Sequence, residues 1–221
     1  MAVKRRRTAP GAPPAAPTER LAQKRRTRKT IVDATIALLA RGETPSVNDV
    51  AAAADVSRRT VYLYFPKFDQ LLIDATVGAL SQPSVARAIE QTDAGEDDGA
   101  RVERMVRALH HVTPELERLG RALIRLTVDT PASADGMPRR GYRRMEWIES
   151  ALSPLRARIA PRLWRRLVCA LAMVVGWEAL IVQRDVCGLT APEGEDLSVW
   201  AARTLVKETL REARRSAVRK R

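Results

Sequence analysis

Residues that bind metals, form disulfides or favour strands are scarce in this sequence. Its 221 residues include two Cys, two His, two Phe, four Trp and three Tyr. Cys169 and Cys187 show neither metal-ligand spacing nor a disulfide framework, which favours a reducing compartment and predicts a cytoplasmic protein. His110 and His111 are neighbours, so on a helix their side chains diverge by about 100° and are poorly placed to share a metal ion. We therefore expect neither a metal nor a cofactor.

Long apolar runs are also missing. The most apolar stretch, Leu167 to Val182, is shorter than the roughly 20 residues that a membrane span needs. It also contains Gly176 and Glu178. We interpret it as part of a buried helix, 161–186, that meets the chain's own core on one face and a partner subunit on the other, in a protein that does not enter the membrane. The basic N-terminus leads into a segment rich in Ala and Pro instead of an apolar run, so no secretory signal is predicted.

Patterns that mark an enzyme are absent as well. The chain carries no Gly-rich phosphate loop, no metal-ligand spacing and no convincing nucleophile paired with a base. We therefore predict a protein that is not an enzyme, and a helical enzyme is the weakest of the alternatives that the residues leave open.

Apolar residues at helical spacing are what the sequence does contain, nearly from end to end. No sustained alternation of apolar and polar residues, which would mark a half-buried strand, interrupts them. The predicted fold class is all-α: an N-terminal three-helix head with a helix-turn-helix, then a larger helical ligand-binding and dimerisation domain, about nine helices together. The expected helices span residues 20–41, 46–54, 57–64, 66 to an acidic loop at 93–99, 100–112, 114–128, 139–160, 161–186 and 192–218.

Positive charge dominates both ends of the chain. The net charge is +13, and the first 30 residues hold ten Lys or Arg against one acid, Glu19. Residues 203–221 hold eight Lys or Arg against two Glu. Such ends favour binding to a polyanion, most often nucleic acid. The predicted domains are a disordered basic tail over 1–18, a DNA-binding domain over 19–66 and a regulatory and dimerisation domain over 67–218.

The segment from Ser46 to Leu71 has the pattern of a helix-turn-helix, in which one short helix crosses the DNA backbone and the next enters the major groove. Ser46 and Ser57 are placed to cap these two helices. Asp55 stands in the turn between them, where Asp tolerates a positive φ better than most residues. Small residues allow the helices to cross closely and Val residues seal the joint from inside: Ala51, Ala53, Ala54, Val50, Val56 and Val61.

The second short helix carries basic and polar residues in its first turn, the part of a recognition helix that reaches base edges. Arg58 and Arg59 are expected to bind bases or phosphates, and the two Tyr residues to contact phosphates or sugars. Lys67 lies at the start of the next helix, where backbone donors favour a phosphate. The predicted contacts to a double-stranded DNA operator are Ser46, Val47, Ser57, Arg58, Arg59, Thr60, Tyr62, Tyr64, Lys67 and, from the basic run of the first helix, Arg28.

Residues 50–67, VAAAADVSRRTVYLYFPK, resemble the core motif of the TetR/AcrR family of bacterial transcriptional regulators. The chain departs from that motif at Asp55, where Gly is usual, at Tyr64, where His is common, and at Lys67, one place before the usual basic position. The resemblance implies a homodimer that pairs through its terminal helices, with a ligand pocket between head and interface. It implies a sequence-specific repressor released by an unknown small-molecule effector. A dimeric regulator without a ligand is the alternative.

Glu178 is the outlier of the apolar C-terminal region, because a carboxylate inside an apolar helix needs a partner. That partner is an Arg, the opposing subunit or a cationic ligand. The ligand pocket is expected to involve His110, Trp147, Trp177 and Glu178, with core or interface positions as alternatives for the Trp residues. The dimer interface is expected to involve Val174, Ile181, Val199, Val206 and Leu210.

Overall fold

The structure is a computed structural model that describes residues 17–41, 43–91, 97–111, 114–128 and 140–218. Within these ranges it is all-α, as the apolar spacing predicts. The elements are α1 (Pro17–Ala40), α2 (Val47–Ala53), α3 (Arg58–Tyr64), α4 (Phe68–Glu90), α5 (Ala100–His110), α6 (Pro114–Val128), α7 (Tyr142–Ala151), the 3₁₀ helix η1 (Ser153–Arg158), α8 (Pro161–Val174), α9 (Trp177–Ile181), the π-helical turn η2 (Val182–Val186) and α10 (Ala191–Val218). Most of the predicted tail, residues 1–16, and much of the acidic loop, 92–96, lie outside the described residues.

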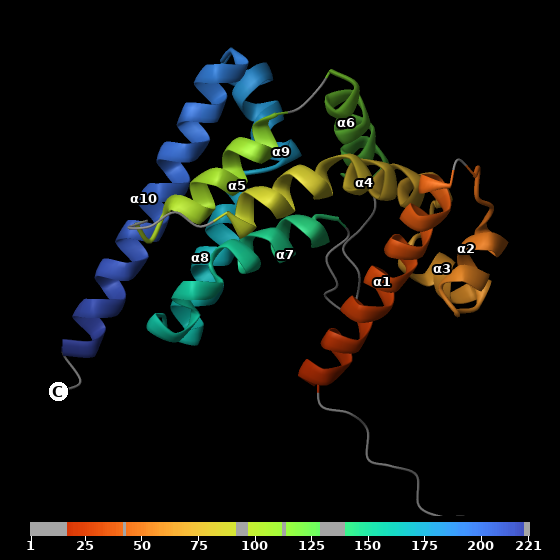
Figure 1. Cartoon of the computed structure of the whole chain (residues 1–221), viewed down its shortest axis with the longest axis horizontal. Coiled ribbons are helices and arrows are strands. Elements are labelled where there is room, and N and C mark those ends of the chain that lie inside the picture. The colour runs from red at the N-terminus through yellow and green to blue at the C-terminus, as the bar shows by residue number, and fades with distance from the viewer. Residues whose placement is uncertain (1–16, 42, 92–96, 112–113, 129–139, 219–221) are drawn as a thin grey trace, which may run out of the picture.

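The elements form a small head and a larger body (Figure 1). Helices α1, α2 and α3 make the head at one end, and α10 lies at the other end. The long helix α4 joins the two parts, since it packs against α1 and also against α5, α6 and α7. Helix α4 is therefore the element that connects the packing of the body with that of the head.

Two separate apolar clusters support these parts. The head cluster is centred on Ile31, Val50, Val61, Phe65 and Leu71, none of which is exposed to solvent. The body cluster brings α4, α5, α7, η1, α8 and α10 together around buried side chains that include Val85, Val102, Met105, Ile148, Leu152, Leu171, Ala202 and Val206. Both clusters arise from stripes at three- and four-residue spacing, which place apolar side chains on one face of each helix.

The predicted continuous buried helix at 161–186 is wrong. Helix α8 ends at Val174, and Gly176 has a φ of 101°, a conformation that L side chains rarely adopt. A Cβ atom on Gly176 would also lie 2.5 Å from Nη1 of Arg144. The chain therefore breaks here and continues as α9 and η2. Within one chain the segment is not buried all round, because Met173 is 77% exposed, and a partner subunit over the exposed face stays a prediction.

Two other boundaries differ from the expectation. The helix expected over 139–160 is divided into α7 and η1, and the 3₁₀ helix has Pro154 in its first turn. Helix α4 begins at Phe68 with Lys67 as its N-cap, so Pro66 precedes the helix instead of opening it.

No single helix among the described residues is long and apolar enough to span a membrane, although the bent pair Pro161–Val174 and Trp177–Val186 passes by length and composition together.

Candidate functional site

The first short helix of the head, α2, begins with a capping box. The Oγ atom of Ser46 accepts a hydrogen bond from the backbone N–H of Asp49 at 3.4 Å. In return, Oδ2 of Asp49 accepts one from the backbone N–H of Ser46 at 2.8 Å. These bonds satisfy donors that a helix N-terminus otherwise leaves without partners, and they fix where α2 starts. The cap predicted at Ser46 is present.

The turn into α3 is equally defined. Asp55 has a φ of 51°, the left-handed conformation expected for it. The backbone N–H of Val56 then donates to the carbonyl oxygen of Ala51 at 3.0 Å, which closes the turn. Ser57 caps α3, because its Oγ accepts a hydrogen bond from the backbone N–H of Thr60 at 3.0 Å. The direction of α3 relative to α2 is thus set by local bonds.

An exposed face of α3 results from this geometry. Val61 and Phe65 point into the head cluster, while Arg58, Arg59 and Tyr62 are exposed. Leu63 is 75% exposed and adds a large apolar side chain to this surface. The sequence reasoning missed Leu63, although it follows Arg59 by four residues and so belongs to the same helix face.

The other predicted contacts surround this face with varying exposure. Ser46 is exposed and Val47 is half-buried. The hydroxyls of Ser57 and Thr60 lie 2.8 Å apart and are engaged with each other. Tyr64 is half-buried and packs against the head cluster, and Lys67 is exposed, with its Nζ 3.4 Å from the carbonyl oxygen of Leu126 in α6.

The prediction that Arg28 contacts DNA is wrong, because Arg28 is only 3% exposed. Its guanidinium stacks on the rings of Phe65, at 3.9 Å from the centroid, and Tyr142, at 4.5 Å. Its Nη1 donates to the carbonyl oxygen of Tyr64 at 2.9 Å, and its Nη2 lies 3.4 Å from Oδ2 of Asp74. Burial raises the pKa of Asp74, although Arg28 and Arg143 act to lower it. Arg28 therefore joins the head to α4 and α7 from inside.

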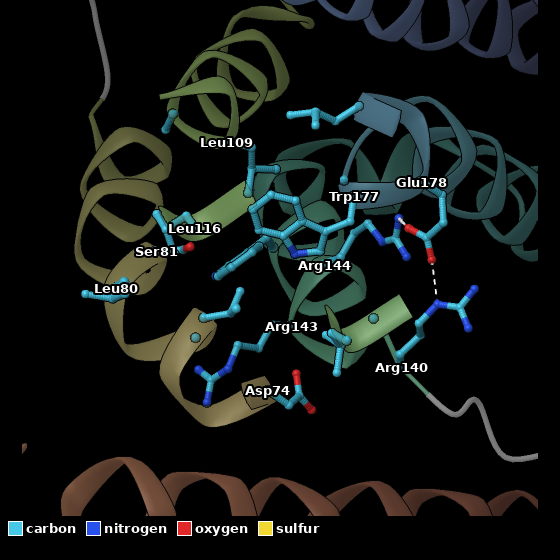
Figure 2. A pocket seen from close by; sticks show the side chains of 18 of the residues that line it. Asp74, Leu80, Ser81, Leu109, Leu116, Arg140, Arg143, Arg144, Trp177 and Glu178 are labelled. Atoms are coloured by element: carbon cyan, nitrogen blue, oxygen red, sulfur yellow. Dashed lines mark hydrogen bonds and ion pairs between the residues drawn. The ribbon is translucent and has the colours of Figure 1, made fainter. Parts of the chain in front are cut away.

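A cavity lies in the body beside α4, with a volume of about 100 Å³. It is lined from α4, α5, α6, α7 and α9 and from the turn before α7. All four residues predicted for a ligand pocket line it, namely His110, Trp147, Trp177 and Glu178. Figure 2 shows the indole of Trp177 extending into the middle of this site, with Leu109 and Leu116 on one side and Arg143 and Asp74 on another.

Glu178 finds its partner in two Arg residues at the cavity wall. Oε1 lies 2.7 Å from Nε of Arg140, and Oε2 lies 2.6 Å from Nη1 of Arg144 (Figure 2). Burial acts to raise the pKa of the Glu178 carboxyl, but these hydrogen bonds and charges outweigh it and lower that pKa to about 2. Of the partners considered from the sequence, the structure therefore contains an Arg pair.

His110 is half-buried at the edge of the cavity. Burial lowers the pKa of its imidazole, and the charges of Arg184 and His111 lower it further against the opposing effect of Glu195. The neutral form is therefore favoured at neutral pH. Among the described residues, no group of three or more His, Cys, Asp or Glu side chains is placed to hold a metal ion.

For three of the predicted interface residues, the prediction is wrong. Val199, Val206 and Leu210 are buried in the body cluster, because that stripe of α10 faces α5 and α8 of the same chain. Val174 and Ile181 are half-buried, and their place in an interface stays a prediction. The exposed apolar side chains on these elements are instead Met173, Val182, Val186, Leu197 and Trp200.

Comparison with known proteins shows which proteins the head resembles. The family model of bacterial regulatory proteins, tetR family, matches residues 31–75, which run from α1 into α4. The HTH-type transcriptional repressor KstR of Rhodococcus jostii is 37% identical over 121 residues, covering 51% of this chain and 52% of that protein. The HTH-type transcriptional repressor LfrR of Mycolicibacterium smegmatis is 42% identical over 65 residues, covering 28% of this chain and 34% of that protein.

The chain thus spans about half the length of the first of these curated relatives and a third of the second. No solved structure matches. The matched segment is the one in which the caps, the left-handed Asp55 and the buried Val61 and Phe65 reproduce a helix-turn-helix. The head of the chain is therefore a helix-turn-helix head of the tetR family of bacterial regulatory proteins.

Proposed function

We propose that this protein is a dimeric transcriptional repressor that binds a double-stranded DNA operator through α3 and is released by a small molecule bound in the body. The observation that carries the proposal is the outward face of α3, where exposed Arg58, Arg59, Tyr62 and Leu63 stand on a helix held by its caps. The two relatives named above are both transcriptional repressors. Such a protein works where DNA is accessible, so we expect it in the cytoplasm.

The outward face of α3 suits the major groove. Guanidinium groups of Arg58 and Arg59 can donate to guanine or to phosphates, and Tyr62 can donate to a phosphate. Leu63 adds an apolar contact of the kind that reads the methyl group of thymine. We propose Leu63 as a DNA contact in addition to the residues predicted from sequence. Arg28 is removed from that set because it is buried.

Dimerisation is supported by exposed apolar residues on α8 and α10. These two helices pack against each other within the chain. Met173 is 77% exposed and Trp200 is 66% exposed. Large apolar side chains gathered at a surface mark an interface. We propose that this surface binds the same surface of a second copy, so that two α3 helices reach half-sites about 34 Å apart.

Ligand release is supported by the cavity and its position along α4. A site lined by apolar side chains with a few convergent polar groups is the usual form of a ligand site. A regulator whose body serves only for dimerisation would be expected to have a filled core there. A ligand that favours one position of α4 shifts the head, and DNA must then weaken ligand binding by the same factor.

The test of DNA binding uses a fluorescent duplex from upstream of the protein's own gene and a scrambled duplex of equal length. We expect specific binding that falls steeply with salt, because several phosphates are contacted. Arg59→Ala should weaken it by about 5- to 100-fold if Arg59 reads a base. The matched control is Arg87→Ala, an exposed Arg at the far end of α4, which should change affinity less than twofold. Equal affinity of the wild type for both duplexes would refute sequence-specific recognition.

Dimerisation is tested by analytical ultracentrifugation of Trp200→Glu beside Val128→Glu, which places the same charge on an exposed apolar residue of α6. We expect the Trp200 variant to sediment as a monomer and the Val128 variant to remain a dimer. If the Trp200 variant remains a dimer with an unchanged dissociation constant of the dimer, the interface lies elsewhere.

A further inference from the structure

We propose that the cavity binds a molecule with an apolar body and a carboxylate, that Arg143 binds the carboxylate, and that this releases Arg143 from Asp33 of the head. The inference rests on the proposed ligand-responsive repressor and names its ligand class and the contact through which the ligand acts.

The apolar body follows from the cavity wall. Leucine and tryptophan side chains provide most of its apolar part, among them Leu80, Leu109, Leu116, Leu123, Trp147 and Trp177. The volume of about 100 Å³ is small beside the roughly 300–1,000 Å³ of typical ligand pockets. The indole of Trp177 takes up part of the space, since it lies in the middle of the site and packs over Gly120, where a Cβ would stand 2.2 Å from the ring (Figure 2). A ligand enters by displacing this ring.

The negative charge of the proposed ligand is inferred from the ion pairs that the charged side chains of the cavity wall already form. Both oxygens of Glu178 are held at 2.6 and 2.7 Å by Arg residues of the wall. Asp74 is paired with Arg28, whose side chain is only 4% exposed. A cationic ligand would have to displace one of these Arg side chains from its acidic partner. The displaced guanidinium would then remain inside the protein as a charge without a partner, which is costly. The acids of the wall are therefore poor sites for a cation.

Arg143 differs from the two Arg residues that hold Glu178, because its ion pair with Asp33 can be given up cheaply. Its Nη2 lies 3.4 Å from Oδ1 of Asp33, while Oδ2 of Asp33 lies 2.5 Å from Nζ of Lys29. The Asp33 side chain is 44% exposed, so after Arg143 leaves it keeps Lys29 and gains water. The Arg143 side chain is only 16% exposed, so a carboxylate that reaches it binds where water screens the charges weakly.

The path of Arg143 explains how this exchange reaches the head. Arg143 stands at the start of α7 and lines the cavity, yet its guanidinium contacts Asp33 of α1. It crosses α4 at Gly78, where a Cβ would lie 2.3 Å from its Nε. Only the missing side chain of Gly78 leaves room for that crossing. A ligand that turns Arg143 into the cavity therefore removes a contact between the body and α1, and the head loses part of its fixed orientation.

The test compares three probes that share one apolar body and differ in their polar end: phenylbutyrate, phenylbutanol and phenylbutylamine. Each is titrated into the full-length dimer by isothermal calorimetry. We expect phenylbutyrate to bind at least tenfold more tightly than phenylbutanol, because charge-assisted hydrogen bonds are the stronger kind. We expect phenylbutylamine to bind most weakly. Equal affinities, tightest binding of the amine, or no binding of any probe would overturn the proposal.

Variants of the Arg143–Asp33 pair should shift the affinity for phenylbutyrate in opposite directions. Arg143→Gln should remove the preference over phenylbutanol, whereas Asp33→Asn should raise the affinity for phenylbutyrate several-fold because Arg143 no longer has to leave the Asp33 carboxylate. Lys29→Gln is the matched control, since it removes the other partner of Asp33 and should not raise that affinity. A purely structural role of the pair would not give opposite signs, and an unchanged Asp33→Asn affinity would overturn the exchange.

The coupling to the head is measured with the operator duplex. Saturating phenylbutyrate should weaken DNA binding of the wild type several-fold and should leave Arg143→Gln unaffected. Equal weakening of both proteins would overturn the relay. If the wild type binds no specific DNA at all, the proposed repressor fails, while the probe affinities still decide whether the cavity selects a carboxylate.

Discussion

Replacing Arg28 by Met separates the structural role of this residue from a role in DNA binding. Met has a similar length and an apolar side chain, so it fills the slot between Phe65 and Tyr142 without placing a cavity there. What it removes is the charge beside Asp74 and the hydrogen bond to the carbonyl oxygen of Tyr64. The change in stability therefore reports the buried polar contacts.

The expected loss in the free energy of unfolding is about 3–5 kcal/mol, because breaking a buried ion pair leaves the other charge without compensation. The Asp74 side chain is only 16% exposed, so water replaces Arg28 poorly. Arg28→Met combined with Asp74→Leu should recover most of the loss, since replacing both partners by apolar groups leaves no buried charge.

Urea denaturation followed by circular dichroism measures these differences. The matched control is Arg25→Met, an exposed Arg one turn earlier on α1, which should change stability by less than about 0.5 kcal/mol. The reasoning is refuted if Arg28→Met costs less than about 1 kcal/mol while the folded variant binds DNA with a salt dependence smaller by about 0.9 in log–log slope. That result would assign Arg28 to a phosphate, as the sequence alone suggested.

Three further outcomes are expected. The pKa of Glu178 is lowered from 4.5 to about 2, so its contribution to stability is complete above pH 4.5 and is lost as the pH falls toward 2. Because its side chain is 36% exposed, that contribution is discounted to about 1–2 kcal/mol, and Glu178→Gln should flatten this acid limb in denaturation curves measured from pH 5 down to 2. Ser57→Ala should lower the free energy of unfolding by about 1 kcal/mol in urea denaturation, through loss of the α3 cap. Gly78→Ala should displace Arg143 and abolish the preference for phenylbutyrate over phenylbutanol in calorimetry, although Ala favours helix by about 1 kcal/mol.

The head could be predicted almost completely from the sequence. Its determinants are local: Ser46 and Ser57 cap the helices that directly follow them, and Asp55 adopts the turn conformation by its own preference. The buried set, including Val50 and Val61, follows from helical spacing within residues 31–75. The family resemblance and the match over residues 31–75 concern this same segment.

The role of Arg28 and the role of the apolar stripe of α10 could not be predicted from local sequence. A basic run on a helix looks the same whether a given Arg faces phosphate or is enclosed, and Arg28 is buried only because Phe65 and Tyr142 close over it. The stripe at Val199 and Val206 is amphipathic whichever partner covers it, and the packing of α5 and α8 of the same chain covers it here.

The helical class, the caps and turn of the head and the outward face of α3 follow from the amino-acid sequence, because these features depend on residues within a few turns of one another. Which charged side chains meet depends on how distant helices pack. Asp33 and Arg143 are 110 positions apart in the chain, and Arg140 and Glu178 are 38 apart. Their pairing depends on how α1, α4, α7 and α9 pack, which no local pattern encodes.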